Sequence, residues 1–176
     1  MGQCLLGTPR TLAWLPPLAW AALIFYLSSG RLEMGDLGVT AFGGFLTNLA
    51  HPGAFGIFAL LLIPLARRRP HPWGGGRWTT LTPEGGLWVV AVSLIYGFTD
   101  ELHQSVVAGR DASVLDILSD GVGAFFVVLV VRYLGRDDAT EGGLRRRLLG
   151  GLLASVAAAA AATAYAERVG RGPWPF

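Results

Sequence analysis

The sequence has 176 residues and a composition that excludes an ordinary soluble domain. Hydrophobic residues make up 52% of it, charged residues only 15%, and the mean hydropathy is +0.49, so a polytopic membrane protein is the expected class. The formal net charge of +2 is small, and no basic stripe with interleaved aromatic residues indicates a nucleic-acid partner. The single cysteine, Cys4, excludes an intramolecular disulfide.

Five apolar stretches approach the length of about 20 residues that a helix needs to cross a bilayer. They are residues 11–29, 45–66, 86–106, 113–131 and 148–165. We therefore predict an all-α fold, a polytopic transmembrane bundle of these spans. Gly109 and Arg110 predict a tight turn, so the third and fourth helices are expected to form a hairpin. No second globular domain is indicated.

The distribution of arginine predicts the orientation of the bundle, because cytoplasmic loops carry the excess of positive charge. All of the basic side chains are arginines, and most fall before the first span or in the loops after the second and fourth. This places the N-terminus in the cytoplasm and, with five spans, the C-terminus outside. The protein is expected in the cytoplasmic membrane, with the lipid bilayer as its first partner. The oligomeric state does not follow from the sequence.

Polar residues inside the apolar spans mark the candidate site, because an ionisable group within a membrane is costly unless it is paired or hydrated. The stretch 96–123 holds most of them, and the predicted orientation brings it to the same outer level of the membrane as Asn48 and His51. Asp116, Asp120 and Gly123 share one helical face. We assign catalytic candidates to His51, Glu101 and Asp116, and ligand-binding roles to Asp100, Gln104, Arg110 and Asp120.

These residue types suit general acid and base catalysis, and an arginine binds phosphate or carboxylate groups in bidentate fashion. His103 has no second histidine four residues away, so the spacing is a weak match to zinc sites. We assign no metal ligand, although a divalent ion held by carboxylate oxygens stays an alternative. The sequence identifies no cofactor, and it contains no G-x-S-x-G motif or phosphate-binding glycine loop.

Taken together in this order, several short elements resemble the VanZ-like family of small bacterial membrane proteins, named after an accessory protein of teicoplanin resistance. The matching residues are His51 with Phe55, the segment 100–104, Gly109 with Arg110, and Asp116, Asp120 and Gly123. Where this chain has Asp120 the family usually has asparagine, and where it has Asn48 the family often has lysine. The resemblance covers about the first 134 residues, so we divide the chain into a VanZ-like domain of four spans (1–134) and an arginine-rich loop with an additional alanine-rich helix (135–176).

The resemblance implies an outward-facing polar site but supplies no substrate. The leading hypothesis is a cell-envelope protein that binds or modifies a lipid-linked or cell-wall component, with lower susceptibility to teicoplanin-type glycopeptides as a consequence. The alternatives are a membrane-embedded hydrolase or transferase acting on a lipid headgroup, a proton- or cation-coupled transporter, and a structural scaffold. The sequence does not decide whether the protein is an enzyme.

Overall fold

The computed structural model describes residues 11–30, 40–66, 68–69, 80–107 and 112–169. These residues form five α-helices, which confirms the predicted all-α class. The helices are α2 (Leu15–Ser29), α3 (Ala41–Leu62), α4 (Pro83–Val106), α5 (Val114–Leu134) and α6 (Glu141–Val169). The 3-10 helix η2 (Ile63–Leu65) continues α3, and the two-residue strands β1 (Arg68–Arg69) and β2 (Thr80–Leu81) pair antiparallel between α3 and α4.

Hydroxyl side chains set the starts of three helices. Thr40 accepts a hydrogen bond from the Gly43 N–H at the start of α3, and Thr82 accepts one from the Gly85 N–H at the start of α4. Ser113 caps α5 in the same way. Such caps satisfy backbone donors that have no partner within the helix. The Thr40 cap explains why α3 begins four residues before the predicted boundary at residue 45.

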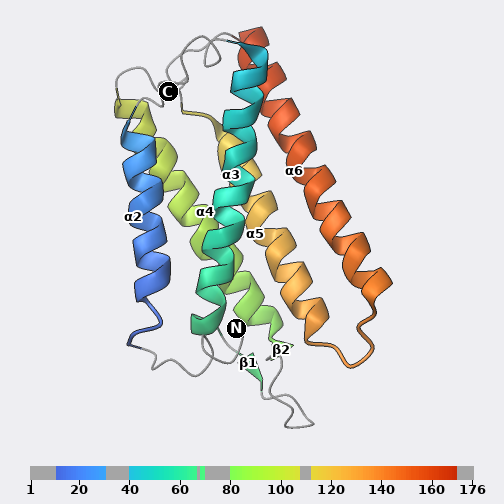
Figure 1. Ribbon diagram of the computed structural model, residues 1–176. Helices are drawn as coiled ribbons and strands as arrows, with labels where there is room; N and C mark the ends of the chain where they lie inside the picture. Colours follow the sequence, from blue (N-terminus) through green and yellow to red (C-terminus); the bar gives the residue numbers. More distant parts are fainter. Residues whose placement is uncertain (1–10, 31–39, 67, 70–79, 108–111, 170–176) are drawn as a thin grey trace.

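Successive helices run in opposite directions across the bundle (Figure 1). Helix α3 lies in the middle, in contact with each of the other four, and α2 and α6 lie on opposite sides of it. Helices α4 and α5 also pack against each other, which agrees with the predicted hairpin, whereas the turn residues Gly109 and Arg110 lie outside the described residues. This arrangement brings the end of α4, the start of α5 and the middle of α3 to one level of the bundle.

The apolar core lies where α3 meets α4 and α5. It includes Phe55, Ala59 and Leu62 of α3, Val89 of α4 and Ala124 of α5, all nearly inaccessible to solvent. At Gly123 of α5 a Cβ atom would overlap the backbone carbonyl of Pro52. Glycine therefore lets α5 approach α3 closely beside His51, as small residues do between membrane helices.

The lengths and apolarity of the helices agree with a membrane protein. Among the described residues, three helical stretches are long and apolar enough to cross a membrane: Ala41–Leu65, Val114–Leu134 and Glu141–Arg168. Helix α2 is apolar but has 15 residues. Helix α4 has 24 residues and carries buried Asp100 and Glu101 near its end, and at 1.5 Å per residue it is about 36 Å long, enough to cross a bilayer.

The last helix is longer than predicted and presents much of its surface outward. It begins at Glu141 rather than at residue 148, and its apolar side chains Leu148, Leu149, Leu152 and Leu153 are exposed on the bundle surface. In a bilayer this surface faces lipid, because exposed apolar side chains are stable there. On its inner side, α6 packs against α3 and α5.

Candidate functional site

His51 and Asp120 connect α3 to α5 inside the bundle. The Nδ1 atom of His51 lies 3.1 Å from Oδ1 of Asp120, and the two side chains are 15% and 1% exposed. An ionised Asp120 only accepts hydrogen bonds, so with the carboxylate the Nδ1–H of His51 is the donor and Nε2 is the nitrogen left for another partner. The close approach of Pro52 and Gly123 brings the two side chains into hydrogen-bonding range.

Asp120 also contacts α4 through a second glycine. A Cβ atom at Gly97 would lie 2.6 Å from Oδ2 of Asp120, so any larger residue at position 97 would displace this carboxyl from its place at the α4–α5 interface. Among the described residues Oδ2 of Asp120 has no hydrogen-bond partner. The Asp120 carboxyl thus contacts His51 of α3 through Oδ1 and packs against Gly97 of α4 through Oδ2.

Glu101 ties the end of α4 to the start of α5. Its Oε2 atom accepts a hydrogen bond of 2.7 Å from the Ser113 N–H, at the position that caps α5. The side chain is completely buried, and its other oxygen, Oε1, has no partner among the described residues. One oxygen of Glu101 therefore has a structural function, and the other remains available to a ligand.

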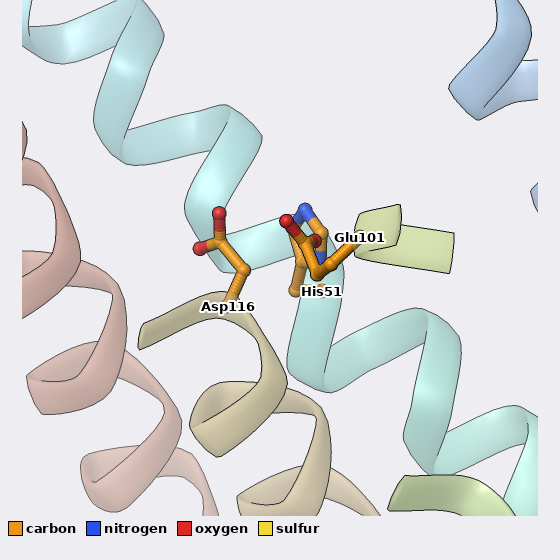
Figure 2. A group of neighbouring side chains, drawn as sticks. All are labelled: His51, Glu101 and Asp116. Carbon is orange, nitrogen blue, oxygen red and sulfur yellow. The ribbon is translucent and has the colours of Figure 1, made fainter. Parts of the chain in front are cut away.

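Asp116 completes a group of three with His51 and Glu101. It lies in the first turn of α5 and is 8% exposed, and its Oδ1 atom has no partner in the described part of the chain. One nitrogen or oxygen atom from each of the three residues lies within 4.8 Å of the other two. Figure 2 shows the three side chains meeting where α3 passes the start of α5 and the end of α4.

The structure thus brings together His51, Glu101, Asp116 and Asp120, which we call the four-residue cluster. His51 is the eleventh residue of α3, not a residue near its start as the predicted boundary implied, because the helix begins at Ala41. Glu101 lies five residues before the end of α4, and Asp116 two residues after the start of α5. The cluster therefore lies near the end of α4 and the start of α5, but near the middle of α3.

Asp100 and Gln104 form a neighbouring pair on α4. Gln104 donates a hydrogen bond of 2.9 Å from Nε2 to Oδ2 of Asp100, and both side chains are buried. Asp100 is not a member of the group of three around His51. The ligand-binding roles predicted for Asp100 and Gln104 therefore stay predictions, and the described contacts of this pair lie within α4.

Two further polar residues of the stretch 96–123 are Arg110 and His103. Arg110, the predicted anion-binding residue, lies outside the described residues, so its role stays a prediction. His103 points to α2, where Nε2 lies 2.9 Å from the Ser29 hydroxyl and the ring stacks on Phe25 at 4.3 Å between centroids. His103 is therefore a half-buried contact residue between α4 and α2.

The sequence did not predict that α6 is linked to α3 by a hydrogen bond beside the cluster. Asn48 donates a hydrogen bond of 3.0 Å to the Thr163 hydroxyl, one turn of α3 before His51. Also missed was Gly97, whose position four residues before Glu101 is the available signal, since small residues in apolar helices mark close packing.

The charges of the four-residue cluster are incompletely balanced. Three carboxyl groups face one imidazole, and oxygens of all three acids lack a partner among the described residues. A buried charge without a partner costs several kcal/mol. Within the described residues, the cluster is therefore balanced only with protons on some carboxyls, or with a cation or hydrogen-bond donor from outside those residues.

An apolar groove lies on the α2 side of the bundle. It has a volume of about 370 Å³. The residues that line it are Trp14, Pro17, Leu18, Ala21, Phe58, Leu62, Val92, Ile95, Tyr96 and Thr99. Thr99 directly precedes Asp100 on α4, and Tyr96 lies four residues before Asp100. The Tyr96 hydroxyl donates a 2.6 Å hydrogen bond to the Ala21 carbonyl.

Comparison with known proteins gives a family. Searches of curated proteins and of solved structures found no match. The profile of the family described as VanZ/LLP1 matches residues 8–135, which is more than half of the chain and includes the whole four-residue cluster. With its apolar helices, the chain is a membrane protein that belongs to the VanZ/LLP1 family.

Proposed function

We propose that the four-residue cluster binds or modifies the headgroup of a lipid-linked component of the cell envelope. The observation that carries the proposal is the convergence of His51, Glu101 and Asp116 from three helices, with carboxylate oxygens left without partners among the described residues. Ionisable side chains inside a membrane bundle are expected to be functional when they are not fully paired.

The His51–Asp120 pair supports proton chemistry at this site. A carboxylate bound to Nδ1 fixes the orientation of the imidazole and stabilises its protonated form, so Nε2 accepts a proton from a hydroxyl group or a water molecule. The free oxygens of Glu101 and Asp116 would accept hydrogen bonds from sugar hydroxyls or ammonium groups of a headgroup. This pair is the specific observation that favours the second candidate, a hydrolase or transferase acting on such a headgroup.

The apolar groove supports a ligand with a hydrocarbon chain. Its lining is apolar apart from Tyr96 and Thr99, and burial of a chain there would contribute about 0.8 kcal/mol for each methylene that leaves water. Tyr96 and Asp100 are four residues apart on α4, so they lie on one helical face. A lipid with its chain in the groove and its headgroup toward the end of α4 fits this arrangement.

The arginine distribution supports an outward-facing site, and the family supports an envelope function. We therefore propose that the cluster faces the outer leaflet, that Arg110 binds an anionic part of the headgroup, and that the protein lowers susceptibility to teicoplanin-type glycopeptides. A transporter has less support, since the buried charged side chains of the described residues are Asp100, Glu101, Asp116 and Asp120, all near one level.

Lipid capture by the purified protein tests the proposal. The protein is extracted from a bacterial membrane, and lipids that remain bound are identified by native mass spectrometry, for the wild type, Glu101→Gln and the control His103→Gln. Glutamine at position 101 still accepts the Ser113 hydrogen bond, so this variant is expected to fold but to lose at least tenfold in retained lipid.

The control should retain lipid as the wild type does, because His103 contacts α2 and not the cluster. Loss of the same lipid in both variants, or in neither, contradicts the proposed site. A fall in the melting temperature of Glu101→Gln without any specific lipid in the wild type supports a scaffold. Teicoplanin susceptibility of a sensitive host that produces each variant then tests the cellular consequence.

A further inference from the structure

The orientation of His51 distinguishes the cluster from a simple group of acids. Its Nδ1 atom lies 3.1 Å from Oδ1 of Asp120, so Nε2 is the nitrogen left for another ligand. Histidines that bind metals almost always donate their second ring N–H to a carboxylate or carbonyl, which fixes the tautomer and raises the basicity of the binding nitrogen. Asp120 and His51 have this arrangement, in addition to joining α3 to α5.

Two buried carboxyl oxygens near His51 are suitable metal ligands. Glu101 is fully buried with Oε1 unpartnered, and Asp116 is 8% exposed with Oδ1 unpartnered, within the described part of the chain. Both residues belong to the group whose ligand atoms lie within 4.8 Å of one another. Ligand atoms around one zinc ion, each about 2.1 Å from it, stand about 3.4 Å apart, so binding would draw the side chains together by little more than an ångström.

We propose that His51, Glu101 and Asp116 bind one divalent transition-metal ion, with Asp120 as the carboxylate that orients His51. One imidazole nitrogen and two carboxylate oxygens suit Zn²⁺ or Mn²⁺ better than Mg²⁺ or Ca²⁺, which prefer ligands that are all oxygen. Two positive charges would also compensate carboxyl groups for which the described residues supply a single basic partner, His51.

Three protein ligands leave at least one coordination position open, as in catalytic rather than structural metal sites. A phosphate oxygen of a headgroup is a suitable occupant, since divalent ions polarise phosphoryl oxygens. This inference rests on the proposed function, because it assumes that the cluster is a ligand site, and it narrows the ligand to a phosphate-bearing headgroup.

Metal content and metal affinity test the inference directly. The full chain is purified with a tag that contains no histidine, treated with a chelator, and titrated with Zn²⁺, Mn²⁺ and Mg²⁺. The wild type and the control His103→Gln are expected to bind one equivalent of Zn²⁺ or Mn²⁺. Glu101→Gln and Asp116→Asn should each bind at least tenfold more weakly, and Asp120→Asn between about 10-fold and 100-fold more weakly.

Two spectroscopic measurements make the result independent of any one variant. Co²⁺ bound to the wild type should give visible d–d absorption, and Mn²⁺ should give an altered electron paramagnetic resonance signal, both lost in the folded variants of Glu101 or Asp116. Binding that is equal in all variants, or absent from the wild type, overturns the inference. If lipid retention still depends on Glu101 while no metal binds, the metal inference fails and the proposed function stands.

Discussion

Two acid–base pairs in this protein have similar chemistry and opposite environments. Arg136 and Asp138, beyond the end of α5, form two hydrogen bonds of 2.7 Å and are more than half exposed. His51 and Asp120 share one contact of 3.1 Å and are buried between helices, with an oxygen left unpartnered among the described residues. Loss of one partner should cost less in the pair with the better geometry, since water competes with that pair and screens its charges.

The comparison shows where a mutation should matter. A buried pair that is broken leaves an uncompensated charge, whereas an exposed one is replaced by water. The following predictions are ordered by the size of the effect that this difference implies.

The largest effect is expected for His51→Ala. Removal of the imidazole leaves Asp120 buried without the partner that the structure shows, and loss of one member of a buried ion pair typically costs about 3–5 kcal/mol. The melting temperature in detergent should fall sharply. The double variant His51→Leu with Asp120→Leu should recover most of the loss, because apolar residues replace buried ion pairs at little cost in stability. A double variant as unstable as the single one would contradict this.

A smaller loss is expected for Gly123→Ala. The added Cβ atom meets the backbone of Pro52, which is unable to move as a side chain would, and overpacking of this kind costs about 1–3 kcal/mol. Gly53→Ala is the matched control, since nothing lies within 4 Å of a Cβ atom there. That control should be neutral or slightly stabilising in thermal unfolding, because alanine favours a helix over glycine. Equal destabilisation by both changes would argue against close contact of α3 with α5.

Asn48→Ala tests the attachment of α6 to α3. It removes the hydrogen bond to Thr163, and such contacts between membrane helices average about 0.6 kcal/mol. We expect a small fall in melting temperature and faster proteolysis near α6, with lipid retention unchanged. Thr163→Val should have the same effect, and the double variant should be no worse than either single change. Fully additive losses would contradict the direct contact.

The smallest effect is expected for Asp138→Asn. The hydrogen bonds and charge of Arg136 hold the pKa of Asp138 below its ordinary value, so any stabilisation is present above the ordinary pKa and is lost as the pH falls through the lowered one. Because both side chains are exposed, the melting temperature should be the same in the variant and the wild type at neutral pH. A clear fall that high salt abolishes would show that the exposed pair contributes more than this account allows.

The sequence predicted the helices well and the contacts between them only in part. Apolar runs are readable because a membrane helix must satisfy its backbone internally and present apolar side chains to lipid. The convergence of His51 with Asp116 and Asp120 followed from alternating helix direction and helical spacing. Each of these inferences needs only the pattern within one helix or the order of the helices along the chain, and the sequence gives both directly.

What the sequence did not predict depends on side-chain geometry between helices. The hydrogen bond from the Ser113 N–H to Glu101, the contact of Gly97 with Asp120 and the link from Asn48 to Thr163 each join residues whose distance is set by packing. The start of α3 was wrong by four residues because the Thr40 cap allows Gly43 and Gly44 to enter the helix. Arg110 and its turn lie outside the described residues.

The central claim is that the four-residue cluster is a ligand site and not a closed structural network. The most direct measurement is an experimental structure in a lipid bilayer at a resolution that shows ions and headgroups. The account predicts density for an ion or a headgroup within about 3 Å of the free oxygens of Glu101 and Asp116. Side chains that pair closely with one another and exclude both water and ligand would contradict it.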